Sequence, residues 1–332
     1  MQPRCGRAWE GGSIGGTGST PLRWTSRRTV FDVDNRAEIR EFLASRRAKV
    51  SPEQVGLPAV GGKRRVPGLR REEVAVLAGV STDWYTRLEK GHISGVSEDV
   101  LDAVARALRL DEAERAHLFD LARAARPSRA PRRQHRNQVR PSLQRVVDAM
   151  VAAPAFVRNG RLDLLAINTL GRALYAPVFD DPSRPANLAR FNFLDPRARD
   201  FYPDWDGAAH TSVALLRTEA GRDPHNRDLT ALVGELATRS EEFRTRWAAH
   251  NVRLHQRGSK SFHHPVVGPL ELAFDAMDLP ADPGLTLTVY TADPGSPSED
   301  GLRLLASWAA TVAPTELPPT SAPTSAPTSK DG

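Results

Sequence analysis

Residues 68–91 read GLRREEVAVLAGVSTDWYTRLEKG, and the order of small and apolar residues in this stretch decides the predicted fold. A helix-turn-helix needs a small residue midway along its first helix, because the second helix crosses close to it, and Ala75 meets that need. Gly79 follows four residues later, where the tight turn requires a positive φ angle. Ser81 then stands at the N-cap of the second helix. The residues expected to hold the motif together are Ala75, Gly79, Val80, Tyr85 and Leu88.

The second helix of such a motif places its N-terminal end in the major groove of double-stranded DNA. There Arg87 can donate two hydrogen bonds to guanine O6 and N7, and a threonine can meet a base edge or the methyl of thymine. Asp83 can accept from cytosine N4 or hold Arg87 one turn along the helix. Trp84 either packs at the edge of the domain or lies against the sugar-phosphate backbone. The candidates for base contacts are Ser81, Thr82, Asp83, Thr86 and Arg87. The candidates for phosphate contacts are Lys63, Arg64, Arg70, Arg71 and Lys90.

Helical patterns surround this motif and predict an all-α domain over residues 34–125. Asn35 is expected to cap the first helix, and Glu38, three residues later, to complete a capping box. Asp111 and Glu114 have the same spacing and predict a second capping box.

Composition agrees with a soluble DNA-binding protein. The formal net charge is +6 and the isoelectric point about 9.9, so the chain is attracted to polyanions, of which nucleic acid is the first to consider. Its longest apolar runs are much shorter than the roughly 20 residues of a membrane helix. The single cysteine, Cys5, excludes an internal disulfide framework and is typical of a reducing compartment. We therefore expect a cytoplasmic protein with no membrane partner.

Three segments lack the periodicity of a folded domain. Residues 1–33 are rich in Gly, Arg, Ser and Thr and are expected to form a disordered leader. An alternative is that translation begins at Val33, at a GTG codon, in which case the leader is not made. Residues 126–140 contain Pro127 and Pro131, are followed directly by Pro141, and carry a run of arginines, which together predict a basic linker. Residues 314–332 repeat Pro, Thr, Ser and Ala and predict a disordered tail.

The remaining residues, 141–313, predict an α+β domain. The first helix carries an apolar stripe at helical spacing, and Asn159-Gly160 separates two short apolar runs. Asn-Gly favours positive φ at both turn positions, so this pair predicts a hairpin. Three later runs predict strands, among which Leu285–Thr291 alternates with Leu285, Leu287 and Val289 on one face, and a final helix follows Ser296-Pro297. Short hairpin-linked strands with helices indicate an antiparallel sheet rather than a parallel one.

These motifs together resemble the Xre/Cro-type transcription regulators, and more narrowly the subgroup with a MmyB-like ligand-binding domain. In the N-terminal half the likeness is carried by residues 68–75, 77–81, 85, 87–91, 100–103, 105–108 and 111–119. In the C-terminal half it is carried by residues 247–253, 264–268 and 289–296. Lys90 stands where the family usually has Arg, and Trp84 where it often has Tyr, which puts in doubt any base preference transferred to that position.

The resemblance implies a lambda-repressor-like helix-turn-helix domain followed by a PAS-like α+β domain with an internal apolar cavity that senses a small, apolar molecule. Apolar and aromatic side chains of the second domain are the candidates to line such a cavity, although they can equally fill an ordinary dry core. These candidates are Phe156, Leu164, Phe191, Phe193, Trp205, Leu272, Phe274 and Val289.

The expected function is therefore a sequence-specific DNA-binding regulator, acting as a homodimer, whose affinity for DNA responds to a small-molecule effector. The alternative is a DNA-binding regulator whose second domain only dimerises or recruits a partner. A third reading is an enzyme in which residues 141–313 bind a redox cofactor. No histidine or cysteine spacing matches a metal site and no nucleophile motif is present, so we expect no metal, no cofactor and no enzymatic activity.

Overall fold

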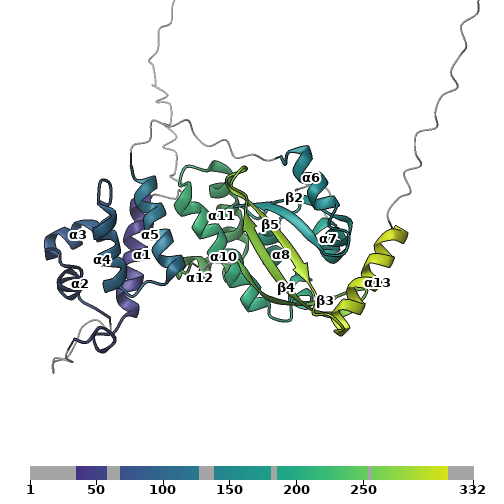
Figure 1. Ribbon diagram of the computed structural model, residues 1–332. Helices are drawn as coiled ribbons and strands as arrows, with labels where there is room; N and C mark the ends of the chain where they lie inside the picture. The colour runs from purple at the N-terminus through teal and green to yellow at the C-terminus, as the bar shows by residue number, and fades with distance from the viewer. Residues whose placement is uncertain (1–34, 58–67, 127–137, 181–184, 253–255, 313–332) are drawn as a thin grey trace, which may run out of the picture. The chain divides into compact units, whose positions relative to one another are not determined.

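The computed structural model describes residues 35–57, 68–126, 138–180, 185–252 and 256–312, and these belong to one structural unit, Val33–Gly332 (Figure 1). The expected leader over residues 1–33, the central part of the expected linker and the expected tail lie outside the described residues, as do the phosphate candidates Lys63 and Arg64.

The N-terminal domain is built from helices alone in its described part. These helices are α1 (Asn35–Lys49), the 3₁₀ turn η1 (Glu53–Val55), α2 (Arg71–Ala78), α3 (Thr82–Glu89), α4 (Glu98–Ala107) and α5 (Glu112–Ala124). Apolar side chains from all five α-helices form one core, which includes Phe42, Val74, Leu101 and Leu118. The all-α architecture predicted for this region is confirmed.

The two predicted capping boxes have different outcomes. Asp111 accepts from the backbone N–H of Glu114, and Glu114 accepts in return from the N–H of Asp111, at 2.8 and 3.1 Å. The box predicted at Asn35 is wrong, because its side-chain Oδ1 accepts no hydrogen bond and its Nδ2 donates to the carbonyl of Leu121. Glu38 therefore does not complete a capping box, and its carboxylate instead accepts hydrogen bonds from Arg217.

The C-terminal domain contains a five-stranded antiparallel sheet with the strand order β2-β1-β5-β4-β3 (Figure 1). Its strands are β1 (Ala155–Asn159), β2 (Leu164–Ile167), β3 (Arg257–His264), β4 (Gly268–Asp278) and β5 (Leu285–Thr291). Its helices are α6 (Pro141–Asp148), α7 (Thr169–Leu174), η2 (Ala176–Phe179), α8 (Leu188–Leu194), α9 (Ala198–Phe201), α10 (Trp205–Arg222), α11 (Arg227–Arg239), α12 (Glu241–Ala248) and α13 (Pro297–Val312). The predicted α+β class is confirmed.

The two faces of the sheet carry different side chains, since successive residues of a strand point to opposite faces. Leu285 and Leu287 of β5 pack with Leu143 and Val147 of α6 on one face. The other face is aromatic, and its rings make edge-on contacts with Phe201 of α9 and with Tyr175 in the turn before η2. Phe191 of α8 packs edge-on against Phe201 and Tyr202. The rings in this second core are Phe156, Tyr175, Phe191, Phe201, Tyr202, Phe262, Phe274 and Tyr290.

The hairpin predicted at Asn159-Gly160 is present, but its predicted turn geometry is wrong. Gly160 does not have a positive φ, whereas Leu162 does, at 67°. The Asn159 side chain sets the turn, because its Oδ1 accepts from the backbone N–H groups of Arg161 and Asp163 at 2.9 and 3.0 Å. A side-chain-closed turn of this kind replaces the mirror-image turn that the dipeptide favours.

Candidate DNA interface

Helices α2 and α3 are joined by a short turn that local chemistry fixes. Gly79 ends α2 with φ 67°, and its N–H donates to the carbonyls of Ala75 and Val76. Ser81 begins α3, with its hydroxyl accepting from the N–H of Trp84 at 3.1 Å. Tyr85 is fully buried, and Leu88, Ala75 and the half-buried Val80 belong to the same core. The five residues expected to hold the motif together thus lie in or at the contact between α2 and α3.

The residues proposed for base contact lie at the N-terminal end of α3 and along its outward face. Ser81, Thr82, Asp83 and Arg87 are exposed, and Thr86 is half-buried. Asp83 and Arg87 form no ion pair in the described part of the chain, so the guanidinium of Arg87 remains available to a ligand. The hydroxyl of Ser81 caps α3, whereas Asp83 and Arg87 present charged side chains to solvent.

The cations proposed for phosphate contact are engaged to different degrees. Lys90, at the end of α3, is exposed. The guanidinium of Arg70 lies 3.3 Å from Glu72, with both groups open to solvent. Arg71 donates to the buried carboxylate of Glu89 at 3.0 Å, so its guanidinium helps to hold α3 in place. Lys63 and Arg64 are outside the described residues.

Glu89 is a functional residue that the sequence analysis missed. It is 2% exposed, and Arg47 of α1 grips it through two hydrogen bonds of 3.0 and 2.9 Å. The same guanidinium donates to the carbonyl of Leu69, before α2, at 2.8 Å. Burial opposes the charge, but Arg47 and Arg71 outweigh it and hold the pKa of Glu89 below its usual value. The clue in the sequence is an acid on the buried face of a helix, one turn after Tyr85, which requires a cation from elsewhere.

A surface hollow lies beside the recognition surface. It is lined by residues from α3, from the following loop and from the start of α4, namely Trp84, Arg87, His92, Ser94, Gly95, Val96, Ser97 and Val100. Trp84 is half-buried and packs against the N-terminal core, as one of its two predicted roles requires, while its remaining surface faces this hollow.

The residues proposed for an effector cavity fall into three places. Phe156, Phe191, Leu272 and Phe274 are buried in the aromatic core of the C-terminal domain. The half-buried Phe193 contacts Trp205 and Phe243, at 6.1 and 5.1 Å between ring centroids, in a second group of rings. Val289 packs on the opposite face of the sheet, with the α6 cluster, and Leu164 is half-buried in β2. The structure therefore brings the first four candidates together in one core, and it places Phe193 and Trp205 together in a second group of rings.

Polar groups among these rings were also missed by the sequence analysis. The hydroxyls of Tyr175 and Tyr290 are 2.7 Å apart, and the hydroxyl of Tyr202 is buried without a hydrogen-bond partner. The ammonium group of Lys260 lies 4.2 Å from the centre of the Tyr202 ring, and burial lowers the pKa of Lys260 to about 7. A lysine on the inner face of an alternating strand is a sequence signal for this feature.

The comparisons with known proteins assign both domains. A model of a helix-turn-helix domain matches residues 38–118. A model of the MmyB-like transcription regulator ligand binding domain matches residues 139–305, about half of the chain. Among curated proteins, none matches the sequence significantly. None of the described helices is both long and apolar enough to cross a bilayer. The chain therefore belongs to the MmyB-like transcription regulators, which join a DNA-binding helix-turn-helix domain to a ligand-binding domain.

Proposed function

We propose that the protein is a cytoplasmic, sequence-specific regulator that reads double-stranded DNA as a homodimer and changes its DNA affinity when a small, apolar effector binds the C-terminal domain. It acts by binding and catalyses no reaction. The observation that carries the proposal is the exposed guanidinium of Arg87, which forms no ion pair with any described residue. It lies on a helix that is capped at one end by Ser81 and held at the other through Glu89.

Rigidity supports this role for α3. A side chain that reads a base edge has to be held at the right position before it meets DNA, since ordering it on binding costs affinity. The carboxylate of Glu89 is held by Arg47 from α1 and Arg71 from α2, so two helices fix one end of α3. The cations that remain exposed around it, Arg70 and Lys90, suit the phosphates on either side of a groove.

A dimer is proposed because one recognition helix covers only part of a typical operator. Two copies would read half-sites about one helical turn apart, or a multiple of that spacing, on one face of the duplex. The effector is proposed on the basis of the matched ligand-binding family and of the aromatic core beside Tyr202 and Lys260. The alternative, in which the C-terminal domain only dimerises or recruits a partner, has the same DNA-binding surface and differs only in the absence of an effector response.

Fluorescence anisotropy with the DNA upstream of the protein's own gene tests the proposal. The wild type is expected to prefer this DNA over a scrambled duplex, and Arg87→Ala to lose about 1–3 kcal/mol of that preference. Lys90→Ala, at a phosphate position, should lower the slope of log affinity against log salt by about 1 and leave the preference unchanged. Arg303→Ala removes the same charge outside the N-terminal domain and serves as the control. Binding that is weak, indifferent to sequence and unaffected by Arg87→Ala would contradict the proposal.

A further inference from the structure

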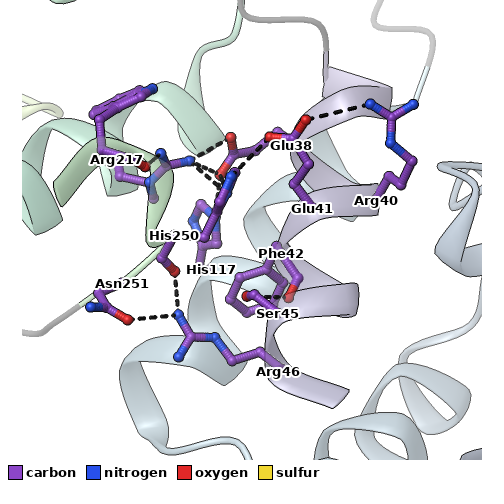
Figure 2. Close-up of polar contacts among 11 residues, drawn as sticks. Glu38, Arg40, Glu41, Phe42, Ser45, Arg46, His117, Arg217, His250 and Asn251 are labelled. Atoms are coloured by element: carbon purple, nitrogen blue, oxygen red, sulfur yellow. Dashed lines mark hydrogen bonds and ion pairs between the residues drawn. The ribbon is translucent and has the colours of Figure 1, made fainter. Parts of the chain in front are cut away.

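A buried group of charged side chains joins the two domains (Figure 2). Arg217 of α10 is fully buried, and its Nη1 donates to both carboxylate oxygens of Glu38 on α1, at 2.5 and 2.6 Å. The same nitrogen donates to Nδ1 of His250 at 2.9 Å, and Nη2 donates to the carbonyl of Trp247. The guanidinium also lies 4.1 Å from the centre of the Trp247 ring. We call Glu38, Arg217 and His250 the junction.

His250 is tied to α1 from both its side chain and its backbone. Nδ1 lies 3.4 Å from the carboxylate of Glu38, and Nε2 lies 2.9 Å from the carboxylate of Glu41. The carbonyl of His250 accepts from Arg46, which is 4% exposed and also pairs with Glu114 at 2.6 Å. His250 has φ 52°, a left-handed conformation that histidine tolerates better than most residues.

Close packing surrounds these charges. A Cβ atom added to Gly221 of α10 would meet Cε1 of His117 on α5 at 2.5 Å, so the two helices touch with no room to spare. Two residues after His250, Val252 is buried in the core of the N-terminal domain. The segment that follows α12 is therefore part of the packing of the DNA-binding domain.

Helix α1 contacts the recognition helix α3 through Arg47, the residue that follows Arg46. Arg46 points to His250 and Glu114, while Arg47, one residue later, holds Glu89 at the end of α3. Helix α1 thus binds α10 through Glu38 near its start. Near its end it binds the carbonyl of His250 through Arg46 and α3 through Arg47. Residues of α1 therefore contact α10, His250 and α3.

We propose that α1 couples the ligand-binding domain to the recognition helix, and that this coupling depends on the junction, which binds α1 to α10. Opening the junction loosens α3 although Arg217 does not touch α3, and this alters DNA binding. The inference rests on the proposed function, because it names the route by which an effector would reach the DNA surface. A contiguous set of contacts only nominates such a route, and a measured coupling between its ends is what establishes it.

Hydrogen exchange of the full-length, DNA-free protein tests the physical coupling. In Arg217→Met, the amides of α3 should exchange about threefold faster or more, along with those of α1. Glu38→Gln keeps the shape of the side chain and serves as the milder variant if Arg217→Met does not fold. The matched control is Arg222→Gln, because Arg222 lies on the same helix and pairs with Asp120 of α5 at 3.2 Å, but at an exposed rim and away from α1. The control should leave α3 unchanged.

A double-mutant cycle then tests the consequence for DNA. Arg217→Met should change the dissociation constant for the upstream DNA about threefold or more in the wild-type background and much less in the Arg47→Met background. Additive effects, or faster exchange confined to α1 and α10 in both junction variants, would overturn the inference while leaving the proposed function intact. If instead exchange spreads to α3 but no variant and no wild-type protein prefers a DNA sequence, the proposed function fails and the coupling stands.

Discussion

Arg87 and Arg217 are both arginines on helices, yet their surroundings are opposite. Arg87 on the outward face of α3 is exposed and has no acidic partner in the described part of the chain. Arg217 is completely buried and binds a carboxylate, an imidazole, a carbonyl and an aromatic face. An exposed charge tolerates the absence of a partner because water solvates it, whereas a buried charge does not. The exposed charge of Arg87 is accessible to a ligand, whereas the buried charge of Arg217 is bound by groups of the protein itself.

Because of this difference, the roles proposed for α3 and for the junction rest on different observations. At α3 the proposed function rests on the exposed side chains of Asp83 and Arg87, which form no ion pair with a described residue and can meet an external partner. At the junction the function follows from what is present, because a buried ion pair is costly to assemble and is weak evidence of added stability. A buried polar contact between two domains is better explained by a need for a defined arrangement, which is the role proposed for it here.

The largest expected effect comes from breaking the junction. Arg217→Met leaves the Glu38 carboxylate buried without its cation, and removal of one partner from a buried pair typically lowers the free energy of unfolding by about 3–5 kcal/mol. Urea denaturation followed by circular dichroism measures the loss. Arg303→Gln removes an arginine that is 67% exposed and paired with Glu299 and Asp300, and should change stability by less than about 1 kcal/mol. Equal losses in the two variants would mean that burial does not decide how much an arginine contributes to stability.

Sequence reasoning succeeded where the structural cause is local. Gly79 needs a positive φ and Ser81 needs a free N–H three residues later, and both requirements are visible within the motif. The alternation of Leu285, Leu287 and Val289 likewise places all three on the α6 side of the sheet. The hairpin at Asn159 was predicted for the wrong reason, since the dipeptide can close a turn through its side chain as well as through its backbone.

The junction was not predictable by the same means. Glu38 and Arg217 are 179 residues apart, and nothing near either residue indicates the other. Glu38 has the spacing of a capping acid relative to Asn35, and this local interpretation was plausible and wrong. His250 lies just after α12 in a sequence that shows no metal spacing and no catalytic pattern. Pairings of this kind depend on how two domains pack, which a single sequence does not state.

A smaller effect is expected from acid. Burial raises the pKa of Glu38, but His117, His250 and the charge of Arg217 outweigh it and hold the pKa well below the ordinary value of a glutamate. A depressed folded-state pKa adds stability that is complete above the unfolded-state pKa, near 4.3, and is lost as the pH falls through the folded-state value. Among the described residues, Glu41 of α1 is the further acid that pairs with His250.

Glu38→Gln isolates this contribution. The variant should lose less stability than the wild type between pH 5 and the acid transition, because it has no carboxylate to protonate at the junction. The measurement is the urea midpoint of both proteins over a pH series, and the difference between them cancels the acids elsewhere. Parallel curves would show that the charge on Glu38 does not contribute, and a steeper loss in the variant would reverse the predicted sign.

The smallest effect is expected at two glycines, one from each region. At Gly79 an added Cβ meets nothing within 4 Å, so Gly79→Ala costs only the left-handed backbone, about 1–2 kcal/mol. Gly221 has no positive φ, and there the cost is overlap with His117, about 1–3 kcal/mol if the helices shift apart. The two alanine variants can therefore have similar stabilities although the cause of the loss differs, backbone strain at Gly79 and side-chain overlap at Gly221. Gly79→Asn, which tolerates the left-handed conformation, should recover most of the loss at the turn, whereas Gly221→Asn should be worse than Gly221→Ala. Thermal unfolding of the four variants decides this, and a rescue by Asn at Gly221 would show that the contact between α10 and α5 is looser than the junction requires.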